Sequence, residues 1–143
     1  RTGDRVMSLP QSCPCGTGHK WVGRVPGRIR TDDIMIPGGV VVNRTYLEDI
    51  LLQMDGAGTQ YALTVAERLN RKGLKRLHIA IEGDPDPKLA DTICHRVRVE
   101  YNHSPVVTIL PPGTIPRAPG KAKRILTPEE YRELVKPFAA YEA

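Results

Sequence analysis

Two stretches, residues 60–68 (QYALTVAER) and residues 74–82 (LKRLHIAIE), decide the fold of this chain. Period-two alternation of large apolar side chains is typical of a strand with one buried face. The connection at 69–73 is short and polar, so the two stretches predict a β-hairpin. The alternating apolar residues are Tyr61, Leu63, Val65, Leu77, Ile79 and Ile81.

Apolar spacing and turn residues define the elements on either side of this hairpin. A Pro-Gly-Gly turn at 37–39 separates two short apolar runs, and apolar residues recur at helical spacing in three other places. Further strands are predicted at 34–36, 40–42 and 105–110, and helices at 44–54, 87–101 and after the N-cap residue Thr127.

Strands and helices interleaved in this order predict an α+β domain. We expect a small mixed or antiparallel sheet with the helices packed on one face. A short β-rich segment is expected before it, because residues 1–33 are rich in Gly, Pro and Arg and show little apolar periodicity. Lys20–Val25 is the best strand within that segment.

The composition indicates which kinds of ligand the chain could bind. The 143 residues suit one domain, and 21 Lys and Arg against 16 Asp and Glu favour anionic ligands. Aromatic residues make up only 5% of the chain and no recognition-module signature occurs, which argues against nucleic acid. Since the sequence has no apolar run of membrane-spanning length, we expect no membrane contact. Three cysteines do not resemble a disulfide framework, so we expect a cytoplasmic protein.

Three short motifs follow one another along the chain. They are residues 1–4 (RTGD), residues 30–33 (RTDD) ahead of Gly39, and residues 115–124 (IPRAPGKAKR), which place Lys121 after a glycine. Each one alone also fits a charged turn or a solvated loop. Their order and spacing together are a stronger signal than any one motif.

Together the motifs resemble those of the adenylate-forming superfamily, which includes acyl-CoA synthetases and adenylation domains. The chain is most similar to the phenylacetate-CoA ligase branch, over roughly residues 1–136, and residues 12–16 (SCPCG) support that placement. The resemblance implies an AMP-forming carboxylate–CoA ligase. Such an enzyme joins a carboxylate to ATP as an acyl-adenylate and then transfers the acyl group to the thiol of CoA.

The resemblance also implies roles for the first two motifs. Asp4 would bind the ribose hydroxyls of the nucleotide, Arg30 would lie near the nucleotide, and Asp32 would be the hinge about which the C-terminal domain rotates. Ile29 stands where the family has Gly, so Arg28 is an alternative to Arg30. Arg30 is favoured because it keeps the family's spacing to Asp32.

Further roles follow for the later residues. Gly38 and Gly39 would border the channel for the CoA pantetheine arm, where a side chain would block it. Lys121 would be the catalytic lysine, whose ammonium offsets the negative charge that develops when a carboxylate attacks phosphate. Lys123 is the nearby alternative and fits the family register less well.

The family pattern divides the chain and implies its partners. Residues 1–32 would be the end of a large N-terminal domain, and residues 33–143 a mobile C-terminal domain. The ligands would be ATP with Mg²⁺, AMP and CoA. Most of the machinery would lie in the large domain, so we expect this chain alone to be inactive. The alternative is a non-enzymatic α+β ligand-binding or regulatory module.

Cys13 and Cys15 form a C-x-C pair that could supply two ligands of a structural zinc site, with His19 as a possible third. A pair without zinc is an equally open interpretation. Cys94 lies in a predicted helix, where a buried small apolar role is expected.

Overall fold

The computed structural model describes residues 6–10, 14–23, 25, 33–68, 71–117, 120 and 122–141. The order of its elements is the predicted order. They are β1 (Asp33–Ile36), β2 (Val40–Asn43), α1 (Arg44–Leu52), β3 (Ala57–Arg68), β4 (Arg71–Gly83), α2 (Pro87–Tyr101), β5 (Val106–Leu110), α3 (Pro128–Val135) and a 3-10 helix (Lys136–Tyr141).

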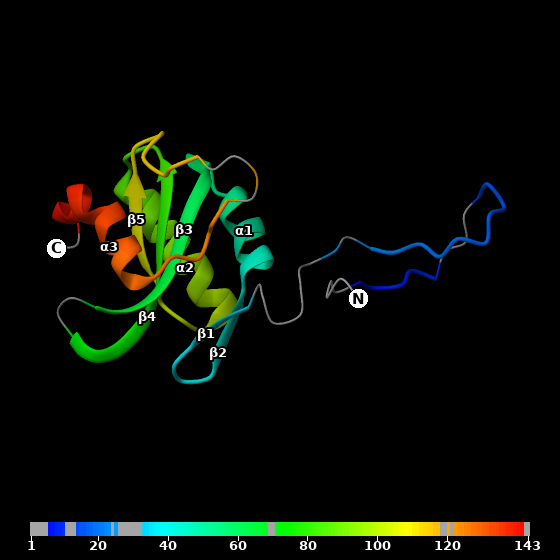
Figure 1. Ribbon diagram of the computed structural model, residues 1–143, viewed down its shortest axis with the longest axis horizontal. Coiled ribbons are helices and arrows are strands. Elements are labelled where there is room, and N and C mark those ends of the chain that lie inside the picture. The colour runs from blue at the N-terminus through cyan, green and yellow to red at the C-terminus, as the bar shows by residue number, and fades with distance from the viewer. Residues whose placement is uncertain are drawn as a thin grey trace.

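The strands form two sheets (Figure 1). β1 and β2 make an antiparallel pair on their own. The larger sheet has the order β3-β4-β5, in which β3 and β4 are antiparallel and β4 and β5 are parallel. A parallel pair needs a crossover connection, and α2 supplies it. The α+β class and the mixed sheet are therefore confirmed.

One face of the larger sheet carries the alternating apolar residues that the sequence predicts. The helices α1 and α2 cover this face, together with β1 and β2. The main core consists of Ile34, Ile36, Val42, Leu47, Leu51, Tyr61, Leu63, Leu77, Ile79, Ile81, Leu89, Ile93 and Val97.

The opposite face is also covered, which differs from the expectation of helices on one face only. α3 packs there, with Tyr131 and Val135 against Ala62, Ala80 and Leu110. The sequence hides this second core because the alternate positions of β3 and β4 are small or polar and look solvent-facing. Four polar residues of this layer are nevertheless buried: Thr64, His78, Glu82 and Thr108.

The N-terminal segment is less regular than predicted. Ser8 and Val22 form an isolated antiparallel bridge, and two backbone hydrogen bonds of 2.9 Å flank it, from Leu9 to Trp21 and from Gly23 to Met7. Within the described residues of Lys20–Val25, the expected strand is thus reduced to this single bridge.

Among the described residues, none of the helices combines the length and the apolar character that crossing a membrane requires.

The second core leads to a first prediction. Ala80→Leu should lower the free energy of unfolding by about 1–3 kcal/mol, because the added side chain overpacks the space between β4 and α3. Urea unfolding followed by far-UV circular dichroism measures the change. Val99→Leu, at a position that is 65% exposed on α2, is the matched control and should leave stability nearly unchanged. Equal effects of the two substitutions would contradict the two-faced core.

Candidate functional site

Several of the residues singled out from the sequence lie outside the described part of the structure. They are Asp4, Cys13, Arg28, Arg30, Asp32 and Lys121. Their roles remain predictions. The described residues on both sides of Lys121 show how the segment that carries it is attached to the domain.

Downstream of Lys121, the chain pairs with the outer edge of β3. Ile125 forms a parallel bridge with Leu63. The amide of Leu63 donates to the carbonyl of Arg124 at 2.7 Å, and the amide of Leu126 donates to the carbonyl of Leu63 at 2.8 Å. The hydroxyl of Thr64 donates to the carbonyl of Leu126 at 2.9 Å. Residues 124–126 therefore add one parallel bridge to the edge of β3.

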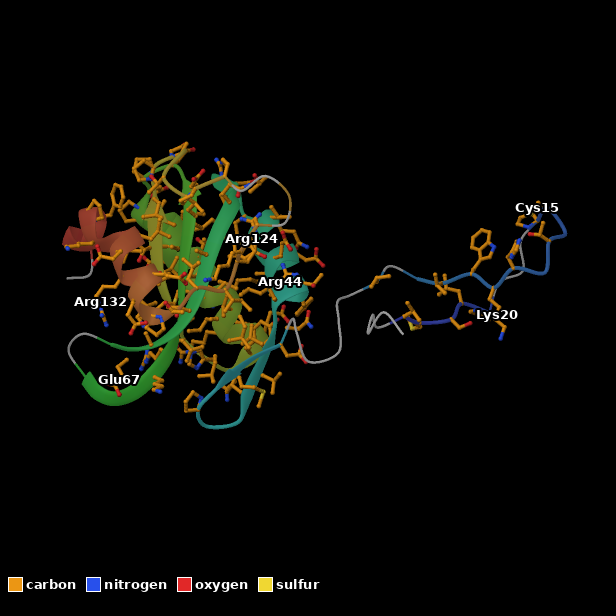
Figure 2. The ribbon with its side chains drawn as sticks, viewed as in Figure 1. Cys15, Lys20, Arg44, Glu67, Arg124 and Arg132 are labelled. Atoms are coloured by element: carbon orange, nitrogen blue, oxygen red, sulfur yellow. The ribbon has the colours of Figure 1, made fainter. Side chains whose placement is uncertain are left out.

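The side chain of Arg124 strengthens this attachment. Its guanidinium donates to the side-chain oxygen of Gln60 at 3.0 Å and to the carbonyls of Tyr61 and Thr59, each at 3.2 Å. It also lies over the ring of Tyr61, 4.5 Å from the centroid, in a cation–π contact. Figure 2 shows Arg124 beside the start of β3. In the sequence this residue is only one more charge of a basic stretch.

Upstream of Lys121, the buried carboxylate of Glu82 holds the chain. One oxygen accepts from the amide of Ile115 at 2.7 Å, and the other accepts from the guanidinium of Arg117 at 2.8 Å. Burial by itself raises the pKa of Glu82, but hydrogen bonds from the backbones of Gly113 and Ile115 and from Arg117 outweigh it. The pKa of this carboxyl therefore lies below its ordinary value of 4.5. The sequence did not point to Glu82, because a charge at a strand end looks solvated.

Lys123, the alternative to Lys121, is held by α3. Its ammonium lies 2.7 and 2.8 Å from the two carboxylate oxygens of Glu130. Glu130 also closes a capping box with Thr127 at the start of α3. The hydrogen bond from Lys123, with that from the backbone of Thr127, keeps the pKa of Glu130 below its ordinary value.

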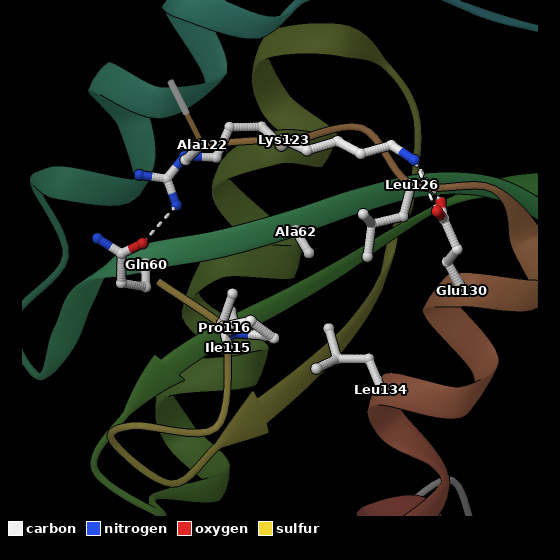
Figure 3. Close-up of a pocket in the computed structure, with 10 residues that line it drawn as sticks. Gln60, Ala62, Ile115, Pro116, Ala122, Lys123, Leu126, Glu130 and Leu134 are labelled. Atoms are coloured by element: carbon white, nitrogen blue, oxygen red, sulfur yellow. Dashed lines mark hydrogen bonds and ion pairs between the residues drawn. The ribbon is translucent and has the colours of Figure 1, made fainter. Parts of the chain in front are cut away.

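A pocket of about 380 Å³ lies between this segment, β3 and α3 (Figure 3). Its lining is mostly apolar, with the Lys123–Glu130 ion pair on one side and Gln60 with Arg124 on the other. The apolar lining residues are Ala62, Ile115, Pro116, Ala122, Leu126 and Leu134.

Gly38 and Gly39 form the turn between β1 and β2. Their φ angles are +103° and +89°, in the region where a side chain is strained. A Cβ built on either glycine would meet nothing within 4 Å. Figure 1 shows this turn at the opposite end of the domain from the loop that follows β5. The space in front of the turn is therefore open to another part of a protein or to a ligand.

The zinc prediction gains no support from the described residues. They contain no cluster of three or more His, Cys, Asp or Glu side chains that could hold a metal ion. Cys15 is disulfide-bonded, and zinc binds the thiolate form of cysteine. Its sulfur lies 3.1 Å from the hydroxyl of Thr17. Zinc ligation by Cys13 and Cys15 stays a prediction, and it requires the reduced form of Cys15.

The lowered pKa of Glu82 gives a pH-dependent prediction. A carboxyl whose pKa is lower in the folded state contributes stability above its ordinary pKa, and this contribution is lost as the pH falls through the folded-state pKa. The free energy of unfolding of the unmodified chain should therefore exceed that of Glu82→Gln at pH 7. The difference should shrink as the pH falls below 4.5.

Urea unfolding at several pH values between about 7 and about 3.5 measures this difference. Glu67→Gln, at an exposed position on β3, is the control and should not change the pH profile in this way. A difference for Glu82→Gln that stays constant over this range would contradict the assigned ion pair.

Comparison with known proteins identifies the family to which this fold belongs. The family model described as the AMP-binding enzyme C-terminal domain matches residues 39–128, which is more than half of the chain. A curated relative, the phenylacetate-coenzyme A ligase of Thermus thermophilus, is 29% identical over 145 residues. That match covers 87% of this chain and 32% of the relative, so the chain spans about a third of the relative's length.

Solved structures agree on the fold. A 2-hydroxyisobutyryl-CoA ligase in its postadenylation state matches with a TM-score of 0.71 at 21% identity, over 96% of this chain and 30% of that one. A domain of phenylacetate-coenzyme A ligase from Bacteroides vulgatus matches with a TM-score of 0.54 at 24% identity, over 68% of this chain and 93% of that domain. With the family model spanning the sheet, α2 and the anchored segment, this chain belongs to the family of AMP-binding enzyme C-terminal domains.

Proposed function

We propose that this chain is the C-terminal part of an AMP-forming carboxylate–CoA ligase similar to phenylacetate-CoA ligase. The observation that carries the proposal is the double attachment of the segment around Lys121. Glu82 holds it on one side, and the edge of β3 holds it on the other. Family membership and the ligase relatives favour this function over a non-enzymatic binding or regulatory module.

In this proposal the chain serves a two-step reaction. A carboxylate and MgATP give an acyl-adenylate and pyrophosphate, and the thiol of CoA then displaces AMP. Related 2-hydroxyisobutyryl-CoA ligase structures were solved with an acyl-AMP and with CoA, which supports both ligands for the family. The ammonium of Lys121 would act in the first step by stabilising the negative charge on the α-phosphate and the attacking carboxylate.

The Gly38–Gly39 turn and the loop after β5 are far enough apart to serve two successive reactions. The glycine turn lies at the opposite end of the domain from the loop after β5, which leads toward Lys121 (Figure 1). A single docking orientation would therefore present only one of them to an active site. We propose that residues 1–32 complete a large N-terminal domain, with Asp4 and Arg30 near the nucleotide. Rotation about Asp32 would exchange the two loops. A cytoplasmic location remains our expectation.

Lys121→Ala in the full-length enzyme should reduce acyl-adenylate formation by about 10² to 10³, the typical effect of losing one charge-stabilising donor. Thioester formation from supplied acyl-adenylate and CoA should change little. ATP–pyrophosphate exchange measures the first step, with the acid that the unmutated enzyme uses fastest in a panel that begins with phenylacetate. Lys123→Ala is the matched control. Equal losses in both steps after Lys121→Ala would contradict the proposed role.

Gly39 gives the complementary test. Gly39→Ala and Gly39→Leu impose the same backbone strain, but only leucine adds bulk to the open space before the turn. Thioester formation should therefore fall about tenfold further with leucine than with alanine, while adenylation should be similar in both. Stopped-flow measurement of AMP release from supplied acyl-adenylate gives the second step. Indistinguishable alanine and leucine variants would argue against a CoA channel at this turn.

A further inference from the structure

Glu82 occupies an unusual place for a carboxylate. It is the last residue but one of β4, only 4% exposed, and it lies beside Leu110 at the end of β5 in the register of the sheet. The chain leaves β5 at that point and forms a tight turn, in which the hydroxyl and the amide of Thr114 both donate to the carbonyl of Pro111. The segment then passes over the carboxylate.

A buried charge of this kind is stabilising only when its oxygens are satisfied, because removing a carboxylate from water is costly. Here both oxygens are used, one by the backbone of Ile115 and one by Arg117. An apolar residue of similar size would fill the same space without that cost. It would leave the amide of Ile115 without an acceptor and Arg117 without a fixed partner.

The contacts with Glu82 set the course of the chain after β5 as well as its position. Ile115 is buried and packs into the second core, so the segment is anchored there by both a side chain and a backbone amide. Arg117 is 55% exposed, yet its guanidinium is bound to a carboxylate that is only 5% exposed. Lys121 follows four residues after Arg117 and stands three residues before Arg124, which holds the other side.

We propose that Glu82 and Arg117 form a latch that positions Lys121 for adenylation, as positioning residues that do not touch the reacting atoms. The inference rests on the proposed function of Lys121. With the latch intact, Arg117 is held four residues before Lys121, which limits where the lysine can go. Without the ion pair, the segment keeps its anchors at Ile115 and at β3 but loses the upstream contact nearest to Lys121, so the ammonium is less often in place.

The test uses Arg117→Met in the full-length enzyme, with folding checked by circular dichroism, because this change leaves one oxygen of the buried Glu82 without its partner. Acyl-adenylate formation should fall about 10- to 100-fold, the cost of displacing a catalytic group by a fraction of its working distance. Thioester formation from supplied acyl-adenylate should stay within about twofold of the unmutated rate, because Lys121 is not used there. Arg117→Lys keeps a charge for Glu82 and should restore part of the loss.

A double variant separates positioning from general damage. Adding Arg117→Met to Lys121→Ala should cause no further loss of adenylation, since the latch acts through the lysine. Glu82→Gln should show the same pattern if it folds. Arg96→Met removes an exposed ion pair with Glu100 on α2 and serves as the matched control. It should leave both steps unchanged.

The outcomes distinguish this inference from the function on which it rests. If the unmutated enzyme forms no acyl-adenylate with any acid of the panel, the proposed function fails; if Lys121→Ala leaves adenylation intact, the role of Lys121 fails and the latch with it. If Lys121→Ala abolishes adenylation but Arg117→Met does not reduce it, the latch is overturned and the function stands. The latch is also overturned if Arg117→Met lowers both steps equally, or if it lowers adenylation further in the Lys121→Ala background.

Discussion

The antiparallel pairing of β3 with β4 is the constraint on which the rest of the domain depends. These are the two longest strands, and they place large apolar side chains on one face and small or polar ones on the other. The first face accepts two helices and the β1–β2 pair. The second accepts α3 and the segment before it. Since both faces are buried, neither strand can slip by one residue without reversing both layers.

The candidate site is built on one end of this sheet. Leu110 ends β5, Glu82 lies near the end of β4, and residues 59–61 lie near the start of β3. The chain after β5 touches these three places in turn, through the Pro111–Thr114 turn, the Glu82 contacts and the Arg124 contacts. The sheet thereby holds in place a segment that has few apolar residues of its own.

Local patterns made much of this arrangement predictable from the sequence. The period of the apolar residues predicted the strand pair, and the N-cap Thr127 was correct because its side chain accepts from a nearby helix amide. Contacts between distant residues leave no such pattern. Glu82 and Arg117 are 35 positions apart, and Arg124 meets residues more than 60 positions away, so in the sequence each is simply a charge. The second core was missed for the same reason, because α3, which buries it, comes much later in the chain.

The bridge between residues 124–126 and β3 has a consequence for the evolution of this segment. These residues pair with β3 on the opposite edge of the sheet from β5, so the intervening chain must reach across the width of the sheet, about 14 Å for three strand spacings. A span fixed at both ends sets a minimum length. The fourteen residues from Pro111 to Arg124 could extend to about 45 Å, so the crossing is well above that minimum, and its course is set by the Glu82 and Arg124 contacts. Small changes in length are therefore compatible with both attachments, whereas the anchoring residues and Lys121 should be retained among functional relatives.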